Sequence, residues 1–284
     1  MKKNTIPGLL LAVTCLLGAA NARADYTDNL LAGWTFNNGT LTSDLGTLSG
    51  GSAVTFSQTG TGGNQTTTFN SVGTVSLGTG RMLYTTAINS TDYPSLLSGV
   101  TIWVRVQFDA TLAQTGIFGL LNTASALTGA AGVNNYSAAL TVNDPTNRVG
   151  AFQGRTASST PLGASSGNPV IPASGFSDIA IRVSDSDPAL GSLVSVTING
   201  VTKSLGWSGG SDDLQSFAAL ALGRIKTDAG TALTFDEVRL YSAYLTDMQL
   251  ASISAVAIPE PGTVALVLGA AALVFSLKRR VRRS

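Results

Sequence analysis

The adjacent carboxylates Asp236 and Glu237 are the part of the sequence closest to a catalytic pattern, because paired carboxylates cleave glycosidic bonds. A retaining mechanism needs the two carboxyl groups about 5–5.5 Å apart. The sequence has only two glutamates, Glu237 and Glu260. Successive side chains of a strand point to opposite faces, so we expect Asp236 to point away from Glu237. Glu237 then shares a face with Arg239, and a structural ion pair is the expected arrangement.

Missing residue types exclude most other catalytic chemistry. Histidine is absent, and Cys15 is the single cysteine among 284 residues. The chain therefore holds no Ser-His-Asp triad, no His-ligated zinc and no disulfide framework. We interpret the protein as a non-enzyme, with a glycan-active enzyme as the third-ranked alternative.

Carboxylates in predicted loops leave a calcium site as one possible kind of metal binding. The loop carboxylates are Asp185, Asp187, Asp212 and Asp213. Ca²⁺ takes oxygen ligands from such loops, but solvated turns use the same residues. We predict no cofactor and no assigned metal ligand, and keep calcium as the alternative.

The charges are segregated along the chain. Lys plus Arg number 17 and Asp plus Glu 16, giving a net charge of +1. Without the eight terminal cations and Glu260, residues 25–258 keep 9 cations and 15 anions. The near-zero net charge gives no case for nucleic-acid binding. Cations gathered at both ends indicate membrane signals there.

Residues 1–24 have the three parts of a secretory signal peptide. Lys2 and Lys3 form the positive start, and residues 9–17 are apolar. Ala22 and Ala24 give the A-x-A pattern that precedes cleavage, here before Asp25. The predicted mature chain therefore contains no cysteine.

Residues 256–284 carry the most specific signal in the sequence. Pro259, Glu260 and Pro261 precede an apolar run over 262–277, which predicts a transmembrane helix. Its 16 residues correspond to about 24 Å of helix, short for a hydrocarbon core of about 30 Å. The basic tail 278–284 supplies the stop-transfer cations Lys278, Arg279, Arg280, Arg282 and Arg283. Such cations stay cytoplasmic, which places the body of the protein outside.

The order of Pro-Glu-Pro, short apolar helix and Arg-rich tail resembles the PEP-CTERM sorting signal of Gram-negative bacteria. The resemblance implies processing near the tripeptide by an exosortase, a membrane-embedded enzyme that would be a partner of this chain. Pro259, Glu260 and Pro261 would be substrate residues. The passenger would cross the inner membrane, stay anchored there transiently, and reach the cell surface or the extracellular matrix.

The pattern of residues 25–255 is β throughout. In Val100–Asp109, Ile102, Val104, Val106 and Phe108 alternate with Trp103, Arg105 and Gln107, which predicts a half-buried strand. Residues 179–183, 218–222 and 235–241 predict further strands. Residues 193–198 and 201–205 flank Asn199-Gly200, which is typical of a hairpin with a type I′ turn. Short strands between turn residues favour an all-β, two-sheet sandwich.

One short helix is expected over residues 247–253. Thr246 and Gln249 have the spacing of a capping box, and Leu245 and Leu250 that of a hydrophobic staple. By contrast, the Gly/Thr/Asn-rich stretch from Gln58 to Asn70 is predicted to be an irregular loop.

Residues 220–253 are similar to the last strands of LamG-like, concanavalin A-like jelly rolls. A Gly-Arg strand there precedes an "Asp-Glu-Val-Arg-Leu-Tyr" strand and a terminal "Leu-Thr-x-x-x-Leu" turn, and Trp34-Thr-Phe36 fits the same layout. The resemblance implies a jelly-roll β-sandwich over 25–255 that binds an exopolysaccharide or another glycan. The alternative is a purely structural surface protein without a specific ligand.

Overall fold

The computed structural model describes the body of the chain in segments. The described residues are 26–46, 48, 53–60, 66–71, 73–108, 115–121, 136–143, 148–153, 170–172, 174–184, 193–205, 216–223 and 232–253. They all belong to one compact unit, Met1–Ser254. The predicted signal peptide and the predicted sorting segment lie outside the described residues. No helix within the described segments is long and apolar enough to cross a membrane.

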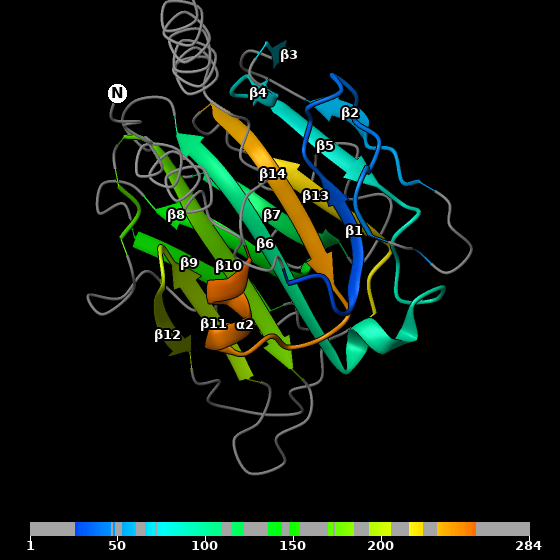
Figure 1. Cartoon of the computed structure of the whole chain (residues 1–284), viewed down its shortest axis with the longest axis vertical. Coiled ribbons are helices and arrows are strands. Elements are labelled where there is room, and N and C mark those ends of the chain that lie inside the picture. Colours follow the sequence, from blue (N-terminus) through cyan, green and yellow to red (C-terminus); the bar gives the residue numbers. More distant parts are fainter. Residues whose placement is uncertain are drawn as a thin grey trace, which may run out of the picture. The chain divides into compact units, whose positions relative to one another are not determined.

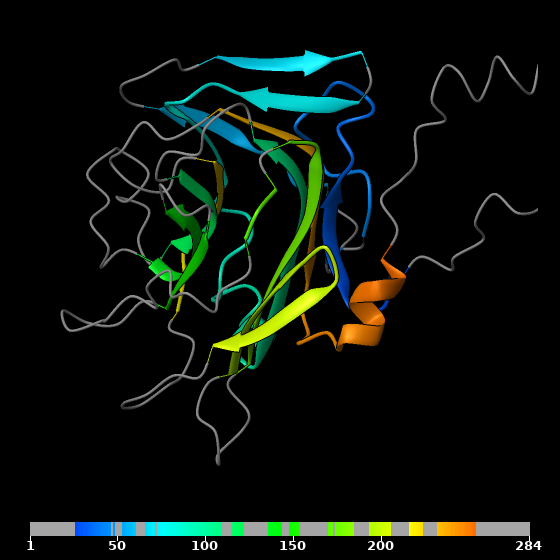
Figure 2. The ribbon, with the colours of Figure 1, turned by 90° about the vertical axis from the view of Figure 1, so that its left-hand side faces the viewer.

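The body is a sandwich of two antiparallel sheets, which confirms the predicted all-β class (Figures 1 and 2). The large sheet has eight strands in the order β12-β11-β10-β6-β14-β4-β3, with β1 also paired to β14. Its strands are β1 (Leu30–Trp34), β3 (Thr67–Asn70), β4 (Thr74–Leu77), β6 (Gly99–Phe108), β10 (Phe176–Ser184), β11 (Leu193–Ile198), β12 (Val201–Leu205) and β14 (Leu233–Tyr241).

The small sheet has six strands in the order β2-β5-β13-β7-β8-β9. Its strands are β2 (Ser57–Gly60), β5 (Arg81–Thr85), β7 (Thr115–Leu121), β8 (Tyr136–Asn143), β9 (Arg148–Gln153) and β13 (Ala219–Gly223). Two helical segments complete the described chain: the 3₁₀ turn η1 (Pro94–Leu97) and the helix α2 (Asp247–Ser252).

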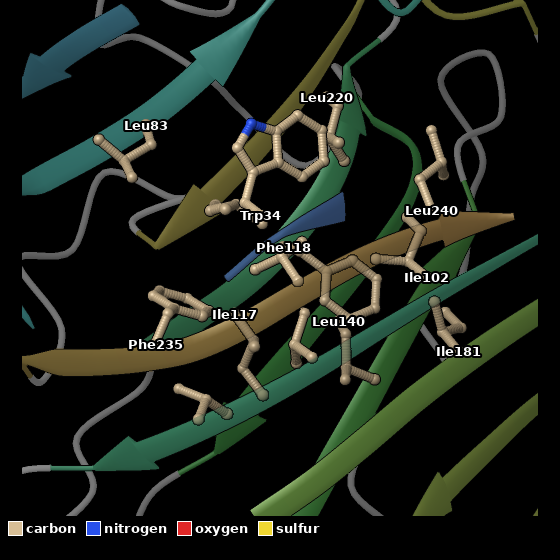
Figure 3. Close-up of a cluster of buried hydrophobic side chains, with 14 of the residues drawn as sticks. Trp34, Leu83, Ile102, Ile117, Phe118, Leu140, Ile181, Leu220, Phe235 and Leu240 are labelled. Atoms are coloured by element: carbon tan, nitrogen blue, oxygen red, sulfur yellow. The ribbon is translucent and has the colours of Figure 1, made fainter. Parts of the chain in front are cut away.

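The core lies between the two sheets, where apolar side chains from both inner faces meet. In Figure 3, Ile102 and Leu240 of the large sheet lie near Phe118 and Leu140 of the small sheet. All four side chains are buried in one cluster. Period-2 alternation produces this layer, because every second residue of each strand points inward. The inward set predicted for β6 is confirmed, since all four of its members belong to the core cluster.

The hairpin of β11 and β12 has the predicted strand limits. Asn199 and Gly200 both have positive φ, 48° and 81°, as a type I′ turn requires. Two hydrogen bonds, one of them to a side chain, attach this turn to β10. The Asn199 amide donates to the Asp178 carbonyl at 2.8 Å, and the Asp178 amide donates to Asn199 Oδ1 at 2.9 Å.

The helix α2 also begins where the capping box predicts. The Gln249 amide donates to Thr246 Oγ1, and the Thr246 amide donates to Gln249 Oε1. In Figure 2, α2 lies on the side of the large sheet that faces away from the small sheet. We call this side the outer face.

Two predictions about local structure are wrong. Residues 57–60 and 67–70, at the ends of the predicted loop, are strands β2 and β3, because they pair with β5 and β4. Strand β6 is buried on both faces near its centre and not half-buried, since Trp103 on its outer face is only 4% exposed. Burial by a distant segment such as α2 leaves no trace in the local alternation of a strand.

Candidate functional site

The outer face of the large sheet gathers most of the charged side chains that the structure places on central strands. Three cross-strand rows run from the β11–β12 hairpin over β10 and β6 to β14. The first row is Asn199, Asp178, Arg105 and Glu237; the second is Thr197, Ala180, Trp103 and Arg239; the third is Ser195, Arg182, Thr101 and Tyr241. Side chains opposite one another in paired strands share a face and interact.

A β-bulge in β14 overturns the expectation that Asp236 and Glu237 point apart. The register with β6 shifts between Phe235 and Glu237, so one extra residue, Asp236, is inserted. Asp236 Oδ2 therefore lies 3.0 Å from Arg105 Nε, and Arg105 is also the cross-strand partner of Glu237. The two adjacent carboxylates lie on the same side of the sheet.

Glu237 and Arg239 form the predicted ion pair, but the pair is buried. Their side chains are 2% and 0% exposed, and Arg239 Nε donates to Glu237 Oε1. The Arg239 guanidinium also lies 5.6 Å from the centre of the Trp103 ring. Solvent and substrate therefore have little access to the Glu237 carboxylate.

Arg105 bridges two further carboxylates. Its guanidinium contacts Asp178 Oδ1 at 3.1 Å as well as Asp236. Burial raises the pKa of Asp236 above its ordinary value of 3.8, Arg105 opposes this rise, and the charge of Asp178 adds to it. Asp236 is thus a carboxylate whose charge is tolerated because Arg105 lies beside it.

Arg182 connects the sheet to the elements that cover its outer face. Its side chain is 3% exposed and donates to the Leu245 carbonyl at 2.8 Å and to Thr197 Oγ1 at 3.1 Å. It also pairs with Asp247 of α2 at 2.7 Å and lies 5.1 Å from the centre of the Tyr244 ring. One guanidinium therefore holds α2, the segment before it and the β11–β12 hairpin together.

A cleft of about 270 Å³ opens between α2, the hairpin and the sheet. Trp103 and Ala180 of the second row line it from the sheet, and Asn199 and Thr202 line it from the hairpin. Asp247 and Leu250 line it from α2. Sequence reasoning did not single out this site. The available signal was Arg182, a cation in the middle of an otherwise apolar strand pattern.

Several predicted site residues lie outside the described residues. They are Ala22 and Ala24, Pro259, Glu260 and Pro261, the cations Lys278, Arg279, Arg280, Arg282 and Arg283, and the calcium candidates Asp185, Asp187, Asp212 and Asp213. Within the described part, no three carboxylates are grouped closely enough to hold a metal ion.

Arg239→Met should lower the free energy of unfolding by about 3–5 kcal/mol, because it removes the cation beside a buried carboxylate. Arg182→Met should cost less, about 1–3 kcal/mol, because its acidic partner Asp247 is 69% exposed and stays solvated when the ion pair is lost. Urea unfolding measures both. Equal losses, or a Glu237→Gln/Arg239→Met double variant as unstable as Arg239→Met, would contradict this account.

Asp236→Asn tests the raised pKa. A raised pKa means that the folded chain holds this proton more tightly than the unfolded chain, so Asp236 lowers stability as pH rises above 3.8 through the folded pKa. The stability of the variant relative to wild type should therefore increase from acid to neutral pH. Urea unfolding across that range measures it, with Asp28→Asn as the control for an exposed carboxylate. A relative stability that decreases with rising pH contradicts the assignment.

No family model and no curated protein matches the sequence. Among solved structures, the chain is similar to a botulinum neurotoxin type C structure whose description names two ganglioside molecules on which the toxin depends to enter cells (TM-score 0.57, 11% identity). That match covers 81% of this chain and 52% of the toxin chain.

Two other similar structures are binding domains of botulinum neurotoxin DC. One is in complex with rat synaptotagmin II (TM-score 0.55, 11% identity, 80% and 51% of the two chains). The other is in complex with SialylT (TM-score 0.54, 12% identity, 81% and 53%). The chain thus spans about half the length of the structures it matches, and at these identities the likeness shows a shared β-sandwich fold.

Proposed function

We propose that this chain is an exported, non-enzymatic protein of the cell surface or extracellular matrix whose β-sandwich binds a glycan. The observation that carries the proposal is the outer-face cleft, where hydrogen-bonding side chains surround a small hollow beside buried apolar residues. Binding sites are typically concave and mostly apolar, with a few fixed polar groups.

The state of the carboxylates supports binding over catalysis. Glu237 is the only glutamate of the body, and it is buried against Arg239. Asp178 and Asp236 are both ion-pair partners of Arg105. A glycosidase needs two carboxyl groups that both reach the substrate, and Glu237, the neighbour of Asp236, is enclosed in its buried ion pair with Arg239.

The similar solved structures support the choice of ligand class. One of these toxin structures is described with gangliosides, and another is a complex with SialylT. The sandwich of this chain has the same fold over about half of their length. Carrying glycan binding over to this chain is part of the proposal.

The sequence pattern of residues 256–284 supports the route to the surface. In this proposal an exosortase processes the chain near Pro259, Glu260 and Pro261. The helix 262–277 and its basic tail anchor the chain transiently in the inner membrane. The order of tripeptide, apolar run and cations is the support for this step.

A glycan array tests the ligand class. The full chain, kept in a polyoxyethylene detergent that contains no sugar, is applied with calcium and with a chelator. We expect retention of at least one glycan. No retention in either condition overturns the glycan-binding proposal and favours a purely structural surface protein.

Alanine substitution of Pro259, Glu260 and Pro261 tests the sorting route. We expect the variant to remain unprocessed at the membrane of a bacterium that has an exosortase, followed by immunoblotting of cell fractions. The control is Arg279→Lys/Arg280→Lys, which keeps the positive tail and should be processed normally. Unchanged processing and location of the alanine variant would remove the exosortase from the proposal.

A further inference from the structure

The cleft on the outer face exists because one row of the sheet contains a small residue. Ala180 lies between Thr197 and Trp103 in the second row, where its methyl group leaves space that a larger side chain would fill. Leu250 of α2 lies across this space. The result is a hollow with an apolar floor and an apolar wall.

Three polar side chains around the hollow keep hydrogen-bonding atoms that the described residues do not use. Asp178 binds Arg105 through Oδ1, which leaves Oδ2. Asp247 binds Arg182 and Thr202 through Oδ1, which again leaves Oδ2. Asn199 accepts the Asp178 amide through Oδ1, which leaves the Nδ2 group as a donor.

These three groups are held in place before any ligand arrives. The Asn199 side chain and the Asn199 amide both bond to Asp178, in a turn with fixed positive φ. Asp247 is fixed by the buried Arg182. Preorganised polar groups lose little conformational entropy on binding, which favours affinity.

The pattern of these groups suits a sugar. Two carboxylate oxygens accept hydrogen bonds from hydroxyl groups, and an amide nitrogen donates to a hydroxyl oxygen. The apolar side chains Trp103, Ala180 and Leu250 suit the C–H face of a pyranose ring. A site built to bond hydroxyl groups strongly rejects analogues that lack them.

The volume and charge of the cleft indicate the size and the charge of the ligand that fits it. About 270 Å³ falls just below the roughly 300–1,000 Å³ of pockets for drug-sized ligands, so it suits one ring. No Lys or Arg is among the described residues that line the cleft, and Arg105 and Arg182 are each already paired with a lining carboxylate, Asp178 or Asp247. An anionic sugar would meet the charges of Asp178 and Asp247 without a free cation from this set, and like charges repel.

A second hollow in the described part is a weaker candidate. It measures about 180 Å³ and is lined by Ser43, Asp44 and Leu45 among others. The carboxylate of Asp44 is already engaged by the Thr35 amide and hydroxyl. Ser43 Oγ likewise accepts the Val54 amide at 2.8 Å. Its polar groups are therefore occupied by the protein itself.

We propose that the cleft between α2, the β11–β12 hairpin and β10 binds one neutral pyranose unit of a glycan. This inference rests on the proposed function and adds the place, the size and the charge of the ligand. Asp178, Asn199 and Asp247 bond the hydroxyl groups. Ala180 leaves room for the ring.

Two variants of the full chain test the cleft, each with a different physical effect. Ala180→Leu fills the floor, and Asp178→Asn removes a carboxylate acceptor while keeping its shape. Asp28→Asn is the matched control, because it removes the same charge from an exposed position that does not line the cleft. Circular dichroism and urea unfolding establish that each variant is folded.

The binding measurement uses titration calorimetry with methyl glycosides of glucose, galactose and mannose, and with N-acetylglucosamine. Glucuronic acid and sialic acid are the anionic comparators. We expect wild type and Asp28→Asn to bind a neutral sugar, and both cleft variants to bind it at least tenfold more weakly.

The possible outcomes distinguish a failure of the cleft proposal from a failure of the glycan-binding proposal. Sugar binding that both cleft variants retain at wild-type strength overturns the cleft proposal and leaves glycan binding standing. Tighter binding of glucuronic or sialic acid than of any neutral sugar overturns the charge assignment. Failure of wild type to bind any of these sugars or any array glycan overturns glycan binding itself.

Discussion

Burial of both faces of the central strands β6 and β14 is the constraint on which the structure depends. On the inner face this burial is met by apolar side chains such as Ile102 and Leu240. On the outer face it covers guanidinium and carboxylate groups, and an unpaired charge there would cost several kcal/mol. Each buried cation that the structure describes on this face has an acidic partner: Arg239 has Glu237, and Arg182 has Asp247. A charged residue can therefore occupy the outer face of these strands only where an oppositely charged partner lies beside it.

The same pairing determines what covers the sheet. Arg182 binds α2 and the segment before it, and Thr101 Oγ1 donates to the Ala243 carbonyl while accepting the Leu245 amide. Gln249 of α2 in turn donates to the Tyr26 hydroxyl at 2.8 Å, so this last helix is also bonded to the first described residue. Between α2 and the sheet, the small side chain of Ala180, itself 2% exposed, leaves the space of the cleft. A feature that stabilises the sandwich thus also creates its candidate binding site.

Local patterns predicted the elements whose chemistry is local. Neighbouring residues were enough to predict three features that the structure confirms. They are the limits of β11 and β12, the Asn199-Gly200 turn and the capping box of Thr246. Strands β2 and β3 were not predicted, because their pairing with β5 and β4, and not their polar composition, makes them strands. The prediction that Asp236 points to the opposite face from Glu237 was wrong, because a β-bulge depends on how β14 pairs with β6. The cleft was out of reach, since it needs α2 packed over Ala180.

Hydrogen exchange of the full chain, with and without a sugar that it binds, tests the central claim most directly. Backbone amides become protected where a ligand orders or covers them. The account predicts slower exchange in β10, in the Asn199-Gly200 turn and in α2, with little change in the small sheet. Protection confined to the small-sheet strands β7, β8 and β9, with β10 and α2 unchanged, would contradict the assignment of the outer face as the binding surface.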